Sequence, residues 1–68
     1  MTAYRYYFRN TSGRAIGWKR IGCDSDLNAR KLAMSMLRQS AEIHDLEAWR
    51  GADIAFRLGK FDVAQSDN

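Results

Sequence analysis

The chain has 68 residues, room for a single domain, and its 11 Lys and Arg residues outnumber 8 Asp and Glu residues for a net charge of +3. No stretch reaches the ~18 apolar residues of a membrane-spanning helix, and the N-terminal segment lacks the apolar core of a signal peptide. The single cysteine, Cys23, excludes an internal disulfide, and no Cys or His spacing matches a zinc site. We therefore expect a cytoplasmic protein with no metal, no other cofactor and no membrane contact.

The positive charge is concentrated ahead of the C-terminal segment. Asp62 and Asp67 lie in a polar tail, so residues 1–60 combine 11 basic with 6 acidic residues, a net charge of +5. This excess favours acidic partners, nucleic acid included, although ordinary surface charge that maintains solubility is the simpler explanation. We assign residues 1–60 to one domain and expect residues 61–68 to form a frayed tail.

The first half of the domain predicts a β-hairpin. Aromatic and basic side chains alternate along residues 4–9, as in a half-buried strand, with one side formed by Tyr4, Tyr6 and Phe8 and the other by Arg5, Tyr7 and Arg9. Residues 10–13 are typical of a turn, and residues 14–23 read as the second strand. A bulge near Lys19-Arg20 is expected there, because it would bring Ile16, Trp18, Ile21 and Cys23 to the core side together.

An amphipathic helix is predicted from Ser25 to Glu42. Asp24-Ser25-Asp26 offers an N-cap and a first-turn acid, which suit the free amides and positive dipole end of a helix. Apolar and small side chains then recur at helical spacing, at Ala29, Leu32, Ala33, Met36 and Leu37.

Residues 43–50 and 54–58 read as a second hairpin. The element order β-β-α-β-β predicts an α+β domain with one helix packed on one face of a four-stranded, mainly antiparallel sheet. Placing the second and third strands on either side of the first makes all neighbours antiparallel, in the spatial order 2-1-3-4.

The face that Trp49 occupies depends on the register of this second hairpin. A two-residue turn at Gly51-Ala52 pairs Trp49 with Ile54 and would let both enter the core, whereas strand periodicity places Trp49 on the same face as Glu47. Burying Glu47 unpaired would cost several kcal/mol, so we expect a three-residue turn with Trp49 outward. The helix-free face would then carry candidate binding residues beside Glu47, namely Arg5, Tyr7, Arg9, Trp49 and Arg57, with Lys19 a further candidate.

Short motifs spread over residues 4–58 resemble a family of very small uncharacterised alphaproteobacterial proteins. Its pattern runs roughly Y-x-x-Y-F, then C-x-x-D-x-x-A, then I-E-V-W-x-G, and here Cys23, Asp26, Ala29 and the segment LEAWRGA correspond. Ala48 replaces the usual valine and Asp53 a common basic residue. That family has no established activity, so the resemblance implies a fold and no mechanism. Residues 4–37, with Ile21-Gly22-Cys23 before the helix, are also similar to HicB-like antitoxins, although no DNA-binding segment follows them.

Catalytic chemistry is not indicated. Cys23 and His44 flank opposite ends of the predicted helix, and ~18 helical residues would separate them by ~27 Å, too far for a thiol–imidazole pair. We therefore expect a non-catalytic module that forms a homodimer or binds another protein through the helix-free face. The alternatives are a single-stranded nucleic-acid binder, which would stack bases on Tyr7 and Trp49, and a HicB-like domain.

Overall fold

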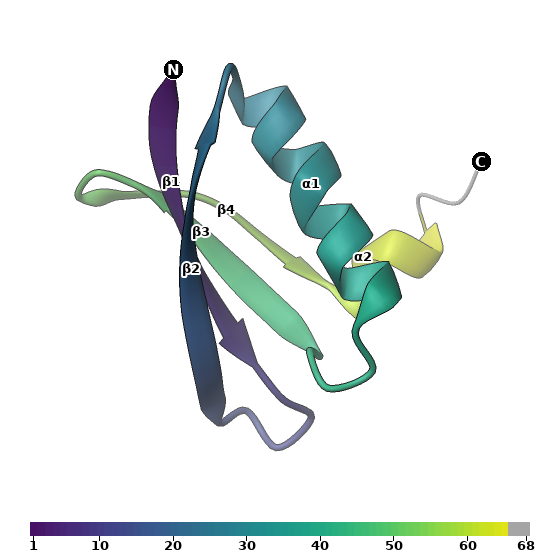
Figure 1. Ribbon diagram of the computed structural model, residues 1–68. Coiled ribbons are helices and arrows are strands. Elements are labelled where there is room, and N and C mark those ends of the chain that lie inside the picture. Colours follow the sequence, from purple (N-terminus) through teal and green to yellow (C-terminus); the bar gives the residue numbers. More distant parts are fainter. Residues whose placement is uncertain (66–68) are drawn as a thin grey trace.

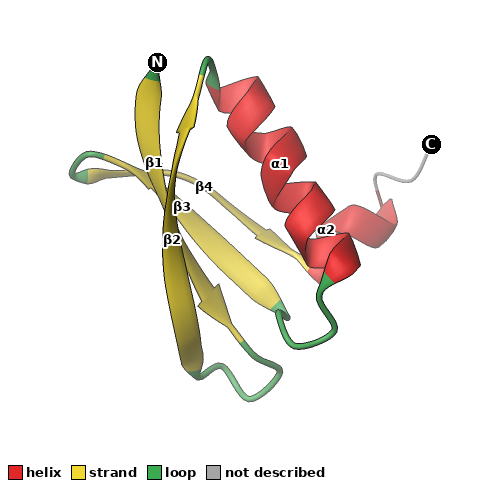
Figure 2. Cartoon of the chain, viewed as in Figure 1, coloured by secondary structure: helices red, strands yellow, loops and turns green. Residues whose placement is uncertain are grey.

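The computed structural model describes residues 1–65 and shows one layer of four strands covered on one face by a helix (Figures 1 and 2). The elements in chain order are β1 (Thr2–Arg9), β2 (Ala15–Cys23), α1 (Asp26–Gln39), β3 (Asp45–Arg50), β4 (Asp53–Gly59) and α2 (Lys60–Gln65). All neighbouring strands are antiparallel, in the order β2-β1-β3-β4. The predicted α+β class and strand order are confirmed. Within this part of the chain, no helix is long and apolar enough to cross a membrane.

The core lies between α1 and the sheet. Alternation along each strand turns one set of side chains toward the helix, and the small Ala29 and Ala33 let the helix approach closely. The Tyr6 hydroxyl donates a 2.9 Å hydrogen bond to the Ala29 carbonyl, which satisfies a polar group inside the core. The buried set is Tyr4, Tyr6, Cys23, Ala29, Ala33, Leu37, Leu46, Ala48 and Leu58.

Both ends of α1 are fixed by side chains. Ser25 is the N-cap, and its Oγ accepts a 3.1 Å hydrogen bond from the Asn28 amide. The helix ends at Gln39, three residues before the expected Glu42, because Ser40 is already extended at φ −111° and ψ 121°. Lys60 Nζ donates a 2.6 Å hydrogen bond to the Ser40 carbonyl, which ties the helix end to the segment after β4.

The first hairpin contains no bulge at Lys19-Arg20, so that prediction was wrong. Pairing runs without interruption from Thr2 opposite Cys23 to Phe8 opposite Gly17, and the register shifts only beyond Phe8. Strict alternation therefore puts Ile21 and Cys23 on the helix side and Trp18 on the opposite face. Trp18 is 62% exposed there and stacks on Tyr7, with ring centroids 6.2 Å apart. Ile16, expected in the core, is also exposed.

The second hairpin reconciles the two rules that conflicted in the sequence. The turn is the two-residue one, with Gly51 at φ 64° and Arg50 opposite Asp53, so the three-residue prediction was wrong. Trp49 nevertheless lies opposite the helix, as expected, because the register shifts between Ala48 and Trp49. Trp49 pairs with Ile54 and Ala48 pairs with Phe56, so β4 contains one extra residue between these two pairs. This residue lets Ala48 and Phe56 face the helix while Trp49 and Ile54 face away from it.

The segment expected to be a frayed tail begins with a helix. Lys60–Gln65 form α2, where the Asp62 carboxylate accepts a 2.8 Å hydrogen bond from the Gly59 amide and Val63 packs against the core. This local cap explains why the chain continues in ordered form beyond β4. The rest of the expected tail, residues 66–68, lies outside the described residues.

Candidate binding surface

The sheet face opposite α1, here called the open face, is the candidate site. Four strands contribute to it, and neither helix covers it in Figure 1. Alternation and pairing assign to the open face Arg5, Tyr7 and Arg9 from β1, Trp18 and Arg20 from β2, Asp45, Glu47 and Trp49 from β3, and Ile54 and Arg57 from β4. The five predicted site residues are therefore brought together on one surface.

Aromatic rings lie on three neighbouring strands of the open face, β2, β1 and β3. Tyr7 stacks on Trp18, and the Arg5 guanidinium lies over the Tyr7 ring, 5.9 Å from its centroid. The indole nitrogen of Trp49 donates a 3.2 Å hydrogen bond to Glu47 Oε1, which fixes the orientation of that ring. A shallow depression of about 360 Å³ lies between Arg5, Tyr7, Glu47 and Trp49. Aromatic rings held in place by such contacts suit stacking or apolar contact with a partner.

Two of the predicted arginines are neutralised by acids on the same face. Arg9 Nε lies 2.8 Å from Asp45 Oδ1, and this hydrogen bond raises the pKa of the Arg9 guanidinium. Arg57 Nη2 lies 3.1 Å from Glu47 Oε2. Glu47 therefore accepts a hydrogen bond from a tryptophan and forms an ion pair with an arginine, so its half-buried carboxylate is well satisfied.

Arg5 and Arg20 form a different kind of pair. They lie directly opposite each other on β1 and β2, and neither has a carboxylate partner among residues 1–65. Arg5 instead donates a 2.8 Å hydrogen bond to the Gly51 carbonyl. Like charges opposed across two strands are unfavourable, so the β1–β2 half of the open face is a region where an anionic group would be stabilising.

Sequence reasoning missed Trp18 and misplaced Lys19. Lys19 pairs with Tyr6 and therefore lies on the helix side. Uninterrupted alternation backward from the buried Cys23 would have placed both residues correctly, but the assumed bulge reversed them. Trp18 is the most exposed aromatic side chain of the sheet, and its stacking on Tyr7 extends the aromatic surface of the open face to the outer strand β2.

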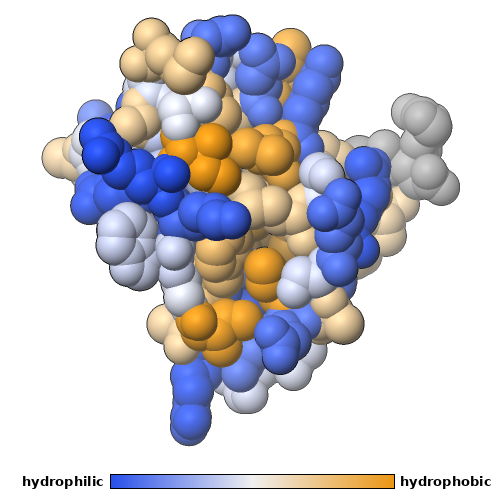
Figure 3. Space-filling model, viewed as in Figure 1, coloured by the Kyte–Doolittle hydropathy of each residue, from blue (hydrophilic) through white to orange (hydrophobic). Residues whose placement is uncertain are grey.

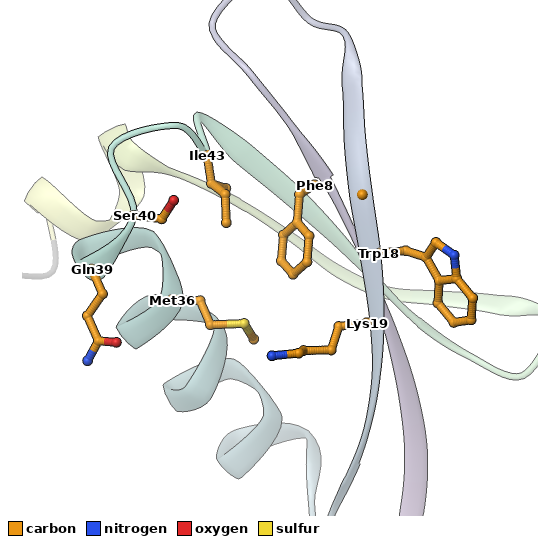
Figure 4. Close-up of a pocket in the computed structure, with 8 residues that line it drawn as sticks. Phe8, Trp18, Lys19, Met36, Gln39, Ser40 and Ile43 are labelled. Carbon is orange, nitrogen blue, oxygen red and sulfur yellow. The ribbon is translucent and has the colours of Figure 1, made fainter.

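An apolar groove lies on the other face, between β2 and the C-terminal half of α1. Figure 3 shows this hollowed, largely hydrophobic strip with hydrophilic side chains on both sides. Its volume is about 370 Å³, and Phe8, Met36 and Ile43 converge in it. Figure 4 shows Lys19 reaching toward Met36 at the opening, while Trp18 points away on the far side of β2.

Several ionisable groups outside the open face have structural partners. Cys23 is buried, with its Sγ 3.9 Å from the Tyr6 hydroxyl, whose pKa is raised mainly by burial. Arg50 Nη1 lies 2.6 Å from both Asp26 carboxylate oxygens, and Asp26 also accepts a hydrogen bond from the Tyr4 hydroxyl. These contacts hold the pKa of Asp26 below its usual value and join the start of α1 to the sheet. In the described residues, no cluster of three or more His, Cys, Asp or Glu side chains is arranged to hold a metal ion.

Comparisons of the chain with protein-family models, curated proteins and solved structures found no match. The resemblance to the small alphaproteobacterial family and the weaker one to HicB-like antitoxins therefore stay predictions.

Proposed function

We propose that this chain is a non-catalytic module that associates with a second copy of itself. The observation that carries the proposal is the position of Trp18, a large aromatic side chain that is 62% exposed on an outer strand of the sheet. Ile54, which pairs with Trp49, is exposed on the same surface. Full burial of one large apolar side chain contributes ~1.5–3 kcal/mol, so a contact that covers these groups in two copies has a substantial driving force.

The size of the domain supports the same conclusion. A chain of this length buries only ~60% of the surface that its unfolded form exposes, and small domains without disulfides or metals often gain stability by association. Repulsion between two positively charged copies opposes association, but it is screened beyond ~8–10 Å at ordinary salt. Apolar burial at the contact is therefore expected to exceed the long-range charge repulsion.

Sedimentation velocity with a pair of matched variants tests this proposal. Trp18→Lys removes the exposed indole and adds a charge, so it should convert the dimer to a monomer without loss of far-ultraviolet circular dichroism. Phe61→Lys makes the same kind of change at a 73% exposed aromatic residue of α2, and it should leave the dimer intact. If both variants sediment like the unmodified protein, the sheet aromatic does not mediate association.

The Arg5–Arg20 pair supports a second function, binding of single-stranded nucleic acid. These two arginines lack an acid partner in the described chain and lie beside Tyr7 and Trp18. The guanidinium groups suit contacts with phosphates, and the two rings suit stacking with bases. Each base–aromatic stack contributes ~1–3 kcal/mol and tolerates any base. The bound species would be a short single strand that crosses β1 and β2.

Fluorescence anisotropy with a labelled oligothymidylate checks this second function. Binding should weaken steeply as salt is raised, because phosphate contacts release counterions. Arg20→Gln should weaken binding and flatten the salt dependence, whereas Arg38→Gln, at another exposed arginine on α1, should do neither. No binding at low salt, or equal effects of the two variants, would remove this candidate.

A further inference from the structure

β2 has the longer uninterrupted free edge of the sheet. It is an outer strand of nine residues, its pairing with β1 is regular from Gly17 to Cys23, and residues 15–20 are all exposed. The other outer strand, β4, is interrupted by a register shift and leads directly into α2. A free edge presents unpaired backbone amides and carbonyls, which another strand can satisfy.

We propose that β2 pairs antiparallel with β2 of a second copy, about a twofold axis through Trp18, and so joins the two sheets into one of eight strands. The inference rests on the self-association proposed above and assigns its surface and register. Symmetric pairing of one patch with itself is the simplest closed arrangement of two identical chains.

The geometry of a sheet restricts where the axis can pass. Residues directly opposite each other across an antiparallel pair share a face. A twofold axis normal to a continuous sheet must therefore pass midway between the two copies of one β2 residue, which then pairs with itself. With the axis at Trp18, the two Trp18 side chains meet on the open face, and Gly17 faces Lys19 of the second copy. No like charges are opposed in this register.

Charge excludes the neighbouring registers. An axis at Lys19 or at Arg20 places two copies of that residue directly opposite each other, and an axis at Gly17 places Arg14 opposite Arg20. Each arrangement is destabilising. An axis at Ile21 opposes no like charges, but it pairs residues 19–23 and leaves both exposed Trp18 side chains uncovered. An axis at Ile16 falls on the register shift, where β2 has one residue more than β1. The Trp18 register opposes no like charges, lies at the start of the regular Gly17–Cys23 segment and brings the two exposed indoles together.

The helix side of β2 fits the same register. Gly17 has open space above it, since a Cβ built there meets nothing within 4 Å. Lys19 of the second copy, facing Gly17, would lay its methylenes in that space at the opening of the groove formed by Phe8, Met36 and Ile43 (Figure 4). One strand pairing thus covers the exposed indole on one face and part of the apolar groove on the other.

A single-cysteine scan across β2 tests the register. Cysteines are introduced one at a time for residues 16–20 in a Cys23→Ala background, and each protein is oxidised mildly at tens of micromolar. Opposite Cα atoms in an antiparallel pair lie ~4.5–5.5 Å apart, within disulfide range, so Trp18→Cys should yield about tenfold more cross-linked dimer than Arg57→Cys on β4. Because that variant loses the indole, a second sample mixes Gly17→Cys with Lys19→Cys, which should cross-link together but not separately.

The outcomes separate this inference from the proposed function. A maximum at another position, or no cross-linking by a protein that still sediments as a dimer, overturns the β2 register and leaves self-association standing. A Cys23→Ala protein and an unmodified protein that both sediment as monomers overturn both. Cross-linking centred on Trp18 together with the mixed Gly17 and Lys19 product supports the pairing.

Discussion

Leu37→Ala tests the packing of α1 on the sheet most sharply, because the helix carries its own control. Leu37 is fully buried, whereas Leu27, ten residues earlier on α1, is 61% exposed. Truncating a buried leucine destabilises by ~2–5 kcal/mol, through lost apolar burial and the cavity that remains. The same substitution at Leu27 should change stability by less than ~0.5 kcal/mol.

The expected loss at Leu37 is large on the scale of the whole domain. At ~0.05–0.15 kcal/mol per residue, a chain of this size has a free energy of unfolding of ~3–10 kcal/mol, so Leu37→Ala could remove most of it. Urea unfolding followed by circular dichroism, at one fixed protein concentration, gives the comparison. Leu37→Met, which nearly conserves volume and should cost less than ~1.5 kcal/mol, keeps the test informative where the alanine variant is unfolded. Equal costs at Leu37 and Leu27 would show that the helix faces are misassigned.

Three further predictions concern charge, backbone and metal. Hydrogen bonds from Arg50 and, second, from Tyr4 lower the pKa of Asp26 from its ordinary 3.8. The ionised Asp26 carboxylate therefore stabilises the fold above that pH, and this contribution is lost as the pH falls through the lowered pKa. Asp26→Asn should therefore destabilise at pH 7 and flatten the fall of the urea midpoint between about pH 5 and pH 2; an unchanged acid limb would refute this. Gly51→Ala should cost ~1–2 kcal/mol because Gly51 has φ 64°, whereas Gly17→Ala should be nearly neutral, and a thermal melt of each compares them. A chelator should leave the thermal midpoint unchanged, and a large drop would reveal a metal that we do not expect.

Elements that depend on a long repeating pattern could be predicted from the sequence. The period of the apolar residues in α1, its Ser25 cap and the alternation in β1 all lead to the observed structure. The strand order followed from the requirement that all neighbours be antiparallel. The open face was located for the same reason, because one helix covers only one side of the sheet.

Single-residue features were not predictable in the same way. A bulge inserts one residue and reverses the faces beyond it, so its absence at Lys19-Arg20 and its presence in β4 each decided where a tryptophan lies. Alternation in the sequence does not show which strand of a hairpin takes up an extra residue when the preferred turn and the preferred buried face require different registers. The short α2 begins with a local contact between the Asp62 carboxylate and the Gly59 amide, and its six residues are too few to show a helical period in the sequence.

The central claim is that the chain forms a homodimer. Sedimentation equilibrium of the unmodified protein from one to one hundred micromolar tests it most directly. We expect the fitted mass to rise with concentration toward twice the 7.8 kDa of one chain. Trp18→Lys should remain at the mass of one chain over the same range. An unmodified protein that stays at 7.8 kDa throughout would contradict the claim.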